Sequence, residues 1–203
     1  MDRLDELVGA AAPLLGRVDD VLTEAGAPAE HGVWDQLRRV RLLPGDAVKV
    51  VAGLRPDDFP AATAELRADA RACVETAAGL PGPGDWEGEA AEAYDRVRER
   101  VAGQLSGGGE SLDERLEATA DLAQALGDWM ATTRSDLAAA LARVLASGEA
   151  VVLGAGIATP PAANEIDAAA EVAAYLLRII ADDYAEAADL LQGSADLAAS
   201  IPM

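Results

Sequence analysis

Residues 112–144 read LDERLEATADLAQALGDWMATTRSDLAAALARV, in which small or apolar side chains recur at alternating steps of four and three residues. This spacing puts them on one side of an α-helix, so it predicts a long helix that packs lengthwise against others. The members of the stripe are Leu112, Leu116, Thr119, Ala123, Leu126, Met130, Thr133, Leu137, Ala140 and Val144.

Just before this stretch, residues 107–109 are three consecutive glycines, and an apolar stripe on their N-terminal side keeps the same phase. That stripe consists of Ala90, Tyr94, Val97, Val101 and Leu105. Each glycine costs a helix about 1 kcal/mol relative to alanine, but a loop has no reason to preserve a helical register. We therefore predict one helix from about Glu87 to Ala146, with the glycines as a point of kinking or fraying.

Stripes with the same period also cover residues 4–25, 59–80 and 166–201. The composition agrees with helices, because hydrophobic residues make up 51% of the 203 residues and aromatic residues only 3%, with alanine the largest share. Alanine favours helices and disfavours strands. Since sustained heptad spacing favours lengthwise packing, we predict an all-α fold, an elongated antiparallel bundle of long heptad-patterned helices with a hairpin turn.

We predict that residues 1–203 form a single domain. Its parts are an N-terminal helical segment at 1–55, a helical hairpin at 57–146, a connection at 147–164 and a C-terminal helix at 165–203. Within the N-terminal segment, residues 33–54 are expected to form short helical pieces around Pro44.

The net charge of the chain limits the classes of partner that it is expected to bind. Sixteen basic residues against 36 acidic ones give a formal charge of −20, which opposes binding to nucleic acids and to anionic lipid surfaces. The first residues, MDRLDEL, are acidic where a secretory signal would be basic. The longest uncharged run, residues 150–164, is too short and too rich in glycine and proline to cross a bilayer. We expect neither nucleic-acid binding nor membrane insertion.

No catalytic constellation emerges from the sequence. The single cysteine, Cys73, and the single histidine, His31, are too few for a zinc site. Cys73 falls on an apolar stripe and is expected in the core, whereas His31 is expected in a solvated loop. Residues 151–158 contain a Gly-x-Gly run without the βαβ pattern of a dinucleotide site, so we predict an apolar connection there. We expect no enzyme, metal, cofactor or small-molecule substrate.

The charge is uneven along the chain. Residues 33–55 carry five basic and two acidic residues, a local +3, whereas residues 104–203 carry 16 acids and four bases, a local −12. Two interpretations stay open: the basic segment folds back on the acidic helices, or it steers an acidic partner.

The sharpest reversal in the chain lies at residues 79–84, Gly-Leu-Pro-Gly-Pro-Gly, because two prolines and three glycines stop a helix. Trp86 follows directly, then Gly88 and Tyr94. Asp85 can cap the next helix, Trp86 can anchor the tip of the hairpin, and Gly88 and the alanines after it allow close approach of another backbone.

The hairpin from about Asp57 to Ala146 resembles the WXG family of small helical proteins associated with type VII (ESX) secretion in actinobacteria. The residues that carry the resemblance are Trp86-Glu87-Gly88 after the turn, followed by a run of small residues and Tyr94. The resemblance implies a non-enzymatic protein, a secreted substrate or a partner subunit, that pairs through its helices with a WXG-like protein, with the secretion machinery or with itself.

The resemblance also implies a location and a set of recognition residues. The protein would be cytoplasmic when made and secreted by a type VII system without a Sec signal. The expected interaction residues are Trp86, Gly88 and Tyr94, with Tyr184 and Asp189 as a degenerate export signal, because Asp189 stands one position beyond the usual spacing. The alternative is an acidic cytosolic coiled-coil adaptor or assembly factor that is not exported.

Overall fold

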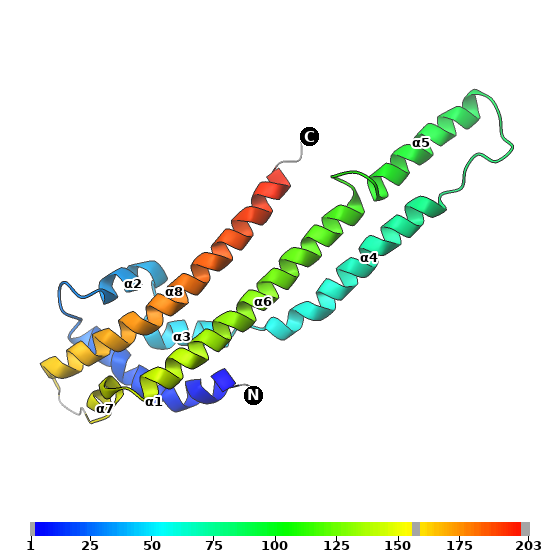
Figure 1. Cartoon of the computed structure of the whole chain (residues 1–203). Coiled ribbons are helices and arrows are strands. Elements are labelled where there is room, and N and C mark those ends of the chain that lie inside the picture. The colour runs from blue at the N-terminus through cyan, green and yellow to red at the C-terminus, as the bar shows by residue number, and fades with distance from the viewer. Residues whose placement is uncertain (1–2, 156–158, 200–203) are drawn as a thin grey trace. The chain divides into compact units, whose positions relative to one another are not determined.

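The computed structural model describes the backbone of residues 3–155 and 159–199 and the side chains up to residue 193, and every regular element within these residues is helical (Figure 1). The all-α prediction is confirmed. The elements are α1 (Arg3–Glu24), α2 (Val33–Val40), α3 (Pro44–Ala52), the 3₁₀ turn η1 (Pro56–Asp58), α4 (Phe59–Gly79), α5 (Glu89–Leu105), α6 (Leu112–Leu145), α7 (Gly148–Ala155) and α8 (Ala163–Ala199).

The chain divides into two compact units. The first contains residues up to 55 and residues 129–189, and the second contains residues 56–128 and the chain from residue 190. The long helices α6 and α8 each contribute to both units. The prediction of a single domain over residues 1–203 stays a prediction.

The first unit holds a large aliphatic core. The stripe predicted for the first helix is confirmed in α1, where Leu4, Ala11, Leu15, Val18 and Leu22 are all buried. Side chains from α2, α3, α6, α7 and α8 complete the same core. The largest fully buried ones are Leu4, Val18, Val21, Val33, Val48, Val51, Thr133, Leu137, Leu141, Leu153, Leu176 and Leu177. Removal of this apolar surface from water stabilises the unit.

The helix α3 is held at both ends by side chains that lie far away in the sequence. At its start, the backbone N–H of Gly45 lies 3.2 Å from both carboxylate oxygens of Asp19 in α1. At its end, Arg134 of α6 donates to the carbonyl oxygens of Ala52, at 2.5 Å, and Leu54, at 3.2 Å. These contacts satisfy backbone groups that the ends of a helix leave unpaired.

The second unit has a small core of small side chains. Among the residues of this unit whose side chains the structure describes, the buried ones are Thr63, Ala70, Ala91, Ser111, Ala120 and Gly127. Arg67 of α4 joins that helix to α6 through hydrogen bonds of 2.9 Å to Asp121 and to Gln124. Because so little of this unit is buried, apolar side chains on its helices stay exposed to solvent.

The prediction of one helix from about Glu87 to Ala146 is wrong. The chain leaves the helix between α5 and α6, and Gly107 there has a φ of 107°, which disfavours any residue with a side chain. The hydroxyls of Ser106 and Ser111 donate to Asp113 at 2.7 and 2.5 Å, and these bonds lower the pKa of Asp113. Side-chain hydrogen bonds thus support the break that the glycines permit.

The stretch that we predicted to be an irregular connection is helical in part. Residues 148–155 form α7, where Leu153 is buried and Val151 is exposed. The remainder of the Gly-x-Gly run, residues 156–158, lies outside the described residues. Among the described helices, none is by itself long and apolar enough to cross a bilayer, whereas α6 and α7, bent by 63° at their break, pass that test of length and composition as a pair.

Candidate interaction surface

The segment that joins α4 to α5 carries the W-x-G residues, and it is shaped by its glycines. Gly88 directly precedes α5 with a φ of 95°, a conformation that glycine adopts far more easily than other residues. A methyl group at Gly88 would meet no atom within 4 Å. Gly88 is therefore needed for its backbone conformation, and the predicted close approach of another backbone at this residue is not observed.

The start of α5 differs from the expected one. The helix begins at Glu89, and no side chain caps it. Asp85, which we predicted as the cap, lies too early in the chain because the turn continues through Gly88. The backbone N–H of Trp86 donates to the carbonyl oxygen of Pro83 at 3.2 Å, so the residues before α5 still form a turn.

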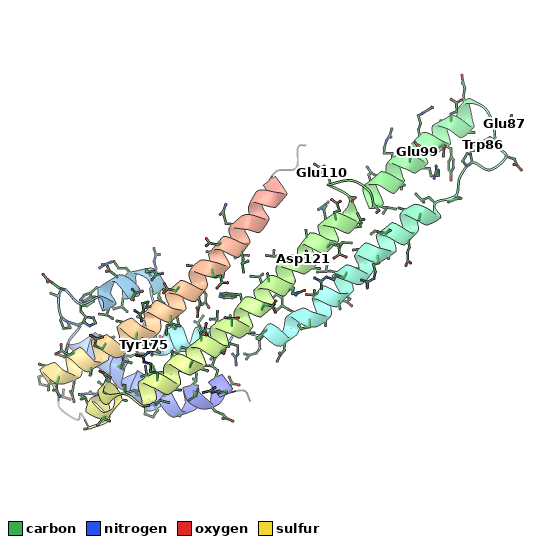
Figure 2. All side chains as sticks on the ribbon, in the orientation of Figure 1. Trp86, Glu87, Glu99, Glu110, Asp121 and Tyr175 are labelled. Carbon is green, nitrogen blue, oxygen red and sulfur yellow. The ribbon has the colours of Figure 1, made fainter. Side chains whose placement is uncertain are left out.

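Trp86 and Tyr94 contact each other at the start of α5. Their ring centroids lie 6.0 Å apart, and the hydroxyl of Tyr94 donates to the carbonyl oxygen of Pro81 at 2.7 Å. Trp86 is nevertheless 53% exposed, and Figure 2 shows it on the loop that joins α4 to α5. Tyr94 thus secures the turn, whereas most of the indole ring of Trp86 faces solvent.

The most apolar side of α5 is exposed to solvent, although the helix contacts α4. Tyr94, Val97 and Val101 are 36%, 52% and 38% exposed. The residues of α5 that are buried or half-buried are Ala91, Asp95, Arg98, Ala102 and Leu105. Of the stripe predicted for this helix, only Leu105 is at least half-buried. The other members of the stripe are exposed to solvent.

Small side chains explain why the other side of α5 is covered. Ala91 and Ala102 permit a close approach between helices. Arg98 is half-buried and forms an ion pair with Asp95 at 2.7 Å, which raises the pKa of Arg98. The exposed side chains Tyr94, Val97 and Val101, together with Trp86, form the surface that we call the α5 stripe.

Exposed charged residues of both signs lie along α5. The acidic ones are Glu89, Glu92 and Glu99, and the basic ones are Arg96 and Arg100. Glu92 and Arg96 approach each other to 3.8 Å, and both are largely exposed, so this pair contributes little to stability. The α5 stripe is therefore an apolar surface with exposed charges next to it.

Tyr184 and Asp189, the predicted export signal, belong to the first unit and not to the unit of Trp86. Both lie in α8, and the edge of one ring of the Tyr184–Trp129 pair faces the other at a centroid distance of 5.3 Å. Burial raises the pKa of Tyr184. Asp189 is exposed. Tyr184 therefore has a structural role in the helical unit.

Sequence reasoning missed Trp129, because the stripe that it followed passes through Met130. Trp129 is only 8% exposed, and its indole N–H donates to the carbonyl oxygen of Asp183 at 2.7 Å. Burial, followed by the negative charges of Asp136, Glu186 and Asp182, raises the pKa of the Asp183 carboxyl to about 6.

His31 and Cys73 also differ from expectation. The Nδ1 atom of His31 accepts a hydrogen bond from the N–H of Val33 at 3.1 Å, and its Nε2 atom lies 3.3 Å from a carboxylate oxygen of Glu171. His31 therefore holds the start of α2 and is not a solvated side chain. Cys73 is half-buried and not enclosed in the core.

The described residues contain no group of three or more His, Cys, Asp or Glu side chains arranged to hold a metal ion. The basic segment is in part folded back, since Arg39 of α2 pairs with Asp182 of α8 at 2.8 Å. Comparison of the chain with models of protein families, with curated proteins and with solved structures finds no match.

Proposed function

We propose that this chain is a non-enzymatic, type VII (ESX) secretion-associated protein, a secreted substrate or a partner subunit, that acts by pairing its helices with a protein partner. The observation that carries the proposal is the α5 stripe, an apolar surface next to an exposed tryptophan at the W-x-G turn. The finer fold prediction, an elongated antiparallel bundle with a W-x-G hairpin turn, is part of the same proposal.

The spacing of the α5 stripe suits a helical partner. Tyr94, Val97 and Val101 stand at positions i, i+3 and i+7, the arrangement by which one helix contacts another along its length. Trp86 adds a large aromatic side chain, and such residues are preferred anchors in protein interfaces. A partner helix that covered these side chains would remove from water the apolar surface that α4 leaves uncovered.

The packing of Tyr184 bears on how the protein would leave the cell. The ring of Tyr184 contacts the ring of Trp129, although 36% of Tyr184 is exposed, and the spacing of Tyr184 to Asp189 departs from the family pattern. In this proposal the paired partner therefore supplies the signal. The same observation favours the alternative, an acidic cytosolic coiled-coil adaptor or assembly factor that is not exported.

Pairing is tested by co-expression of the chain with a small WXG-like protein encoded beside its gene, followed by size-exclusion chromatography with light scattering. We expect a complex with the wild-type chain or a homodimer of it. Val97→Glu should abolish pairing, whereas Val151→Glu should not, although Val151 in α7 is even more exposed, at 72%. If the wild type is a monomer and forms no complex, the proposal is wrong.

Export is tested separately, by fractionation of the native culture with the secretion ATPase active or deleted. Export of the wild type that depends on the ATPase, and its loss in Trp86→Ala, would support a secreted substrate. Retention of the wild type in the cytoplasm together with normal pairing would support the adaptor.

A further inference from the structure

The loop before α2 places the single histidine of the chain at the start of that helix. α2 begins at Val33, and Gly32 before it has no side chain that could cap the helix. The Nδ1 atom of His31 lies 3.1 Å from the backbone nitrogen of Val33 and accepts its N–H. Because the first N–H groups of a helix have no partner within the helix, the imidazole ring of His31 serves as the cap of α2.

This cap requires the neutral form of the imidazole ring. A ring nitrogen that accepts a hydrogen bond carries no proton, so the proton of the neutral ring is on Nε2, which lies 3.3 Å from a carboxylate oxygen of Glu171 in α8. When the ring takes up a second proton, both nitrogens become donors. The Nδ1–H group of His31 would then point at the N–H of Val33, and the hydrogen bond between them would be lost.

The charges around His31 act on the second proton in opposite directions. Glu171 favours the charged ring, but its side chain is 67% exposed whereas that of His31 is 18% exposed, and ion pairs at exposed carboxylates are weak. Glu30, Asp35 and Arg38 line the same surface depression as His31. Asp35 and Arg38 pair with each other, and Glu30 is exposed. The start of α2 itself disfavours a cation, because the helix dipole is positive there.

The loss of the cap outweighs the attraction to these carboxylates. An N–H group that loses its acceptor in a partly buried position costs more free energy than an exposed ion pair returns. The group concerned belongs to Val33, whose side chain is fully buried in the core of the first unit. Further along α2, Arg39 pairs with Asp182 of α8 at 2.8 Å, so the other end of the helix keeps its own attachment when the cap is lost.

We infer that His31 is a pH-sensitive cap, which in its neutral form holds the start of α2 on the first unit and on protonation releases it, so that Val33 becomes accessible to solvent. Histidine is the side chain whose charge changes between about pH 5 and pH 8, and this chain has one histidine. The cap lies in the first unit and the α5 stripe in the second, so the inference is independent of the proposed function.

The test is hydrogen exchange of the backbone amides of residues 33–37 in the full-length chain, measured by nuclear magnetic resonance. It is done at pH 7.5 and at a lower pH at which the Cε1–H resonance of the single imidazole shows that the ring carries the second proton. Protection factors remove the intrinsic effect of pH on exchange. In the wild type, protonation should lower the protection roughly tenfold, as expected for the loss of a partly buried hydrogen bond.

Substitutions of His31 separate its effect from that of other groups. In His31→Asn the side-chain oxygen replaces Nδ1 and accepts the N–H of Val33 at any pH, so the protection should be high at both pH values. In His31→Ala the acceptor is absent, so the protection should be low at both. Glu171→Gln is the matched control at the other ring nitrogen, and it should keep the fall in protection. Far-ultraviolet circular dichroism checks that every variant is folded.

Three results would overturn the inference. Constant protection in the wild type while the ring gains its second proton would show that α2 does not need the cap. A rise in protection would show that the pair with Glu171 outweighs the hydrogen bond to Val33. A fall of the same size in His31→Ala would assign the pH dependence to other groups. Pairing through the α5 stripe is tested with Val97→Glu, so failure of one proposal is distinguishable from failure of the other.

Discussion

The carboxylate of Asp19 in α1 accepts the backbone N–H of Gly45 at the start of α3, and the absence of a side chain at Gly45 leaves room for it. Both carboxylate oxygens of Asp19 lie 3.2 Å from the backbone nitrogen of Gly45, and a methyl group on Gly45 would lie 2.4 Å from one of them. An anion at the start of a helix also interacts favourably with the helix dipole. This contact between residues 26 positions apart adds a polar connection between α1 and α3 to their apolar packing.

Gly45→Ala should destabilise the first unit by about 1–3 kcal/mol, because the added methyl group displaces the carboxylate that accepts the Gly45 N–H. Urea denaturation monitored by circular dichroism measures the change. Gly16→Ala is the matched control in α1, where a methyl group would meet no atom within 4 Å, and it should stabilise the helix by up to about 1 kcal/mol. Equal stability of Gly45→Ala and the wild type would contradict the fit described above.

Arg134→Met should be destabilising, by about 1.5–3 kcal/mol, because it removes the hydrogen bonds that a buried guanidinium donates to the end of α3 and to Asp5. Arg134 is 8% exposed, and besides the carbonyl oxygens at the end of α3 it contacts Asp5 of α1 at 3.1 Å. Arg115→Met, at an exposed position of the same helix, should change the stability by less than about 0.5 kcal/mol. Thermal denaturation of the two variants tests the difference, and similar melting temperatures would refute it.

The helices could be predicted from the sequence where an apolar stripe meets a clear stop signal. The stripe of α1 and the Pro-Gly run after α4 are such cases, since both act locally along the chain. The break between α5 and α6 could not be predicted, because the apolar stripe keeps the same helical phase on both sides of the glycines. The hydrogen bonds of Ser106 and Ser111 to Asp113 leave no periodic pattern in the sequence.

The residues of the interaction surface could be named from the sequence, but their surroundings could not. The apolar stripe of α5 is visible as a pattern, whereas its exposure depends on α4 packing against the neighbouring alanine side. Likewise, Arg134 and Asp19 are ordinary polar residues in the sequence. Their roles arise from partners about 80 and 26 residues away, which periodicity does not reveal.

Asp183→Asn should stabilise the protein at neutral pH and lose this effect in acid. The pKa of the carboxyl is raised from 3.8 to about 6 by burial and by neighbouring negative charges. Above pH 6 the carboxylate is ionised in the folded chain at a cost, and below pH 3.8 it is protonated in both the folded and unfolded chain. The raised pKa therefore lowers the stability as the pH rises from about 4 to 6.

The measurement is the melting temperature of Asp183→Asn and the wild type between pH 4 and pH 8. Asp189→Asn is the control, because it removes one negative charge from the same helix at an exposed position. A gain in stability for Asp183→Asn that exceeds that of the control at pH 8 and vanishes near pH 4 is the expected result. A gain in melting temperature for Asp183→Asn that is the same at all pH values would contradict the raised pKa of Asp183.

Gly88→Ala should destabilise the second unit by about 1–2 kcal/mol, because its φ of 95° is unfavourable for a residue with a Cβ atom. Gly103→Ala in the interior of α5, where nothing lies within 4 Å of the added methyl group, should instead stabilise the helix by up to about 1 kcal/mol. The two substitutions are expected to change the stability in opposite directions because the two glycines differ in backbone conformation. Hydrogen exchange of α5 amides measures both changes, and slower exchange in Gly88→Ala would show that the W-x-G turn does not require this glycine.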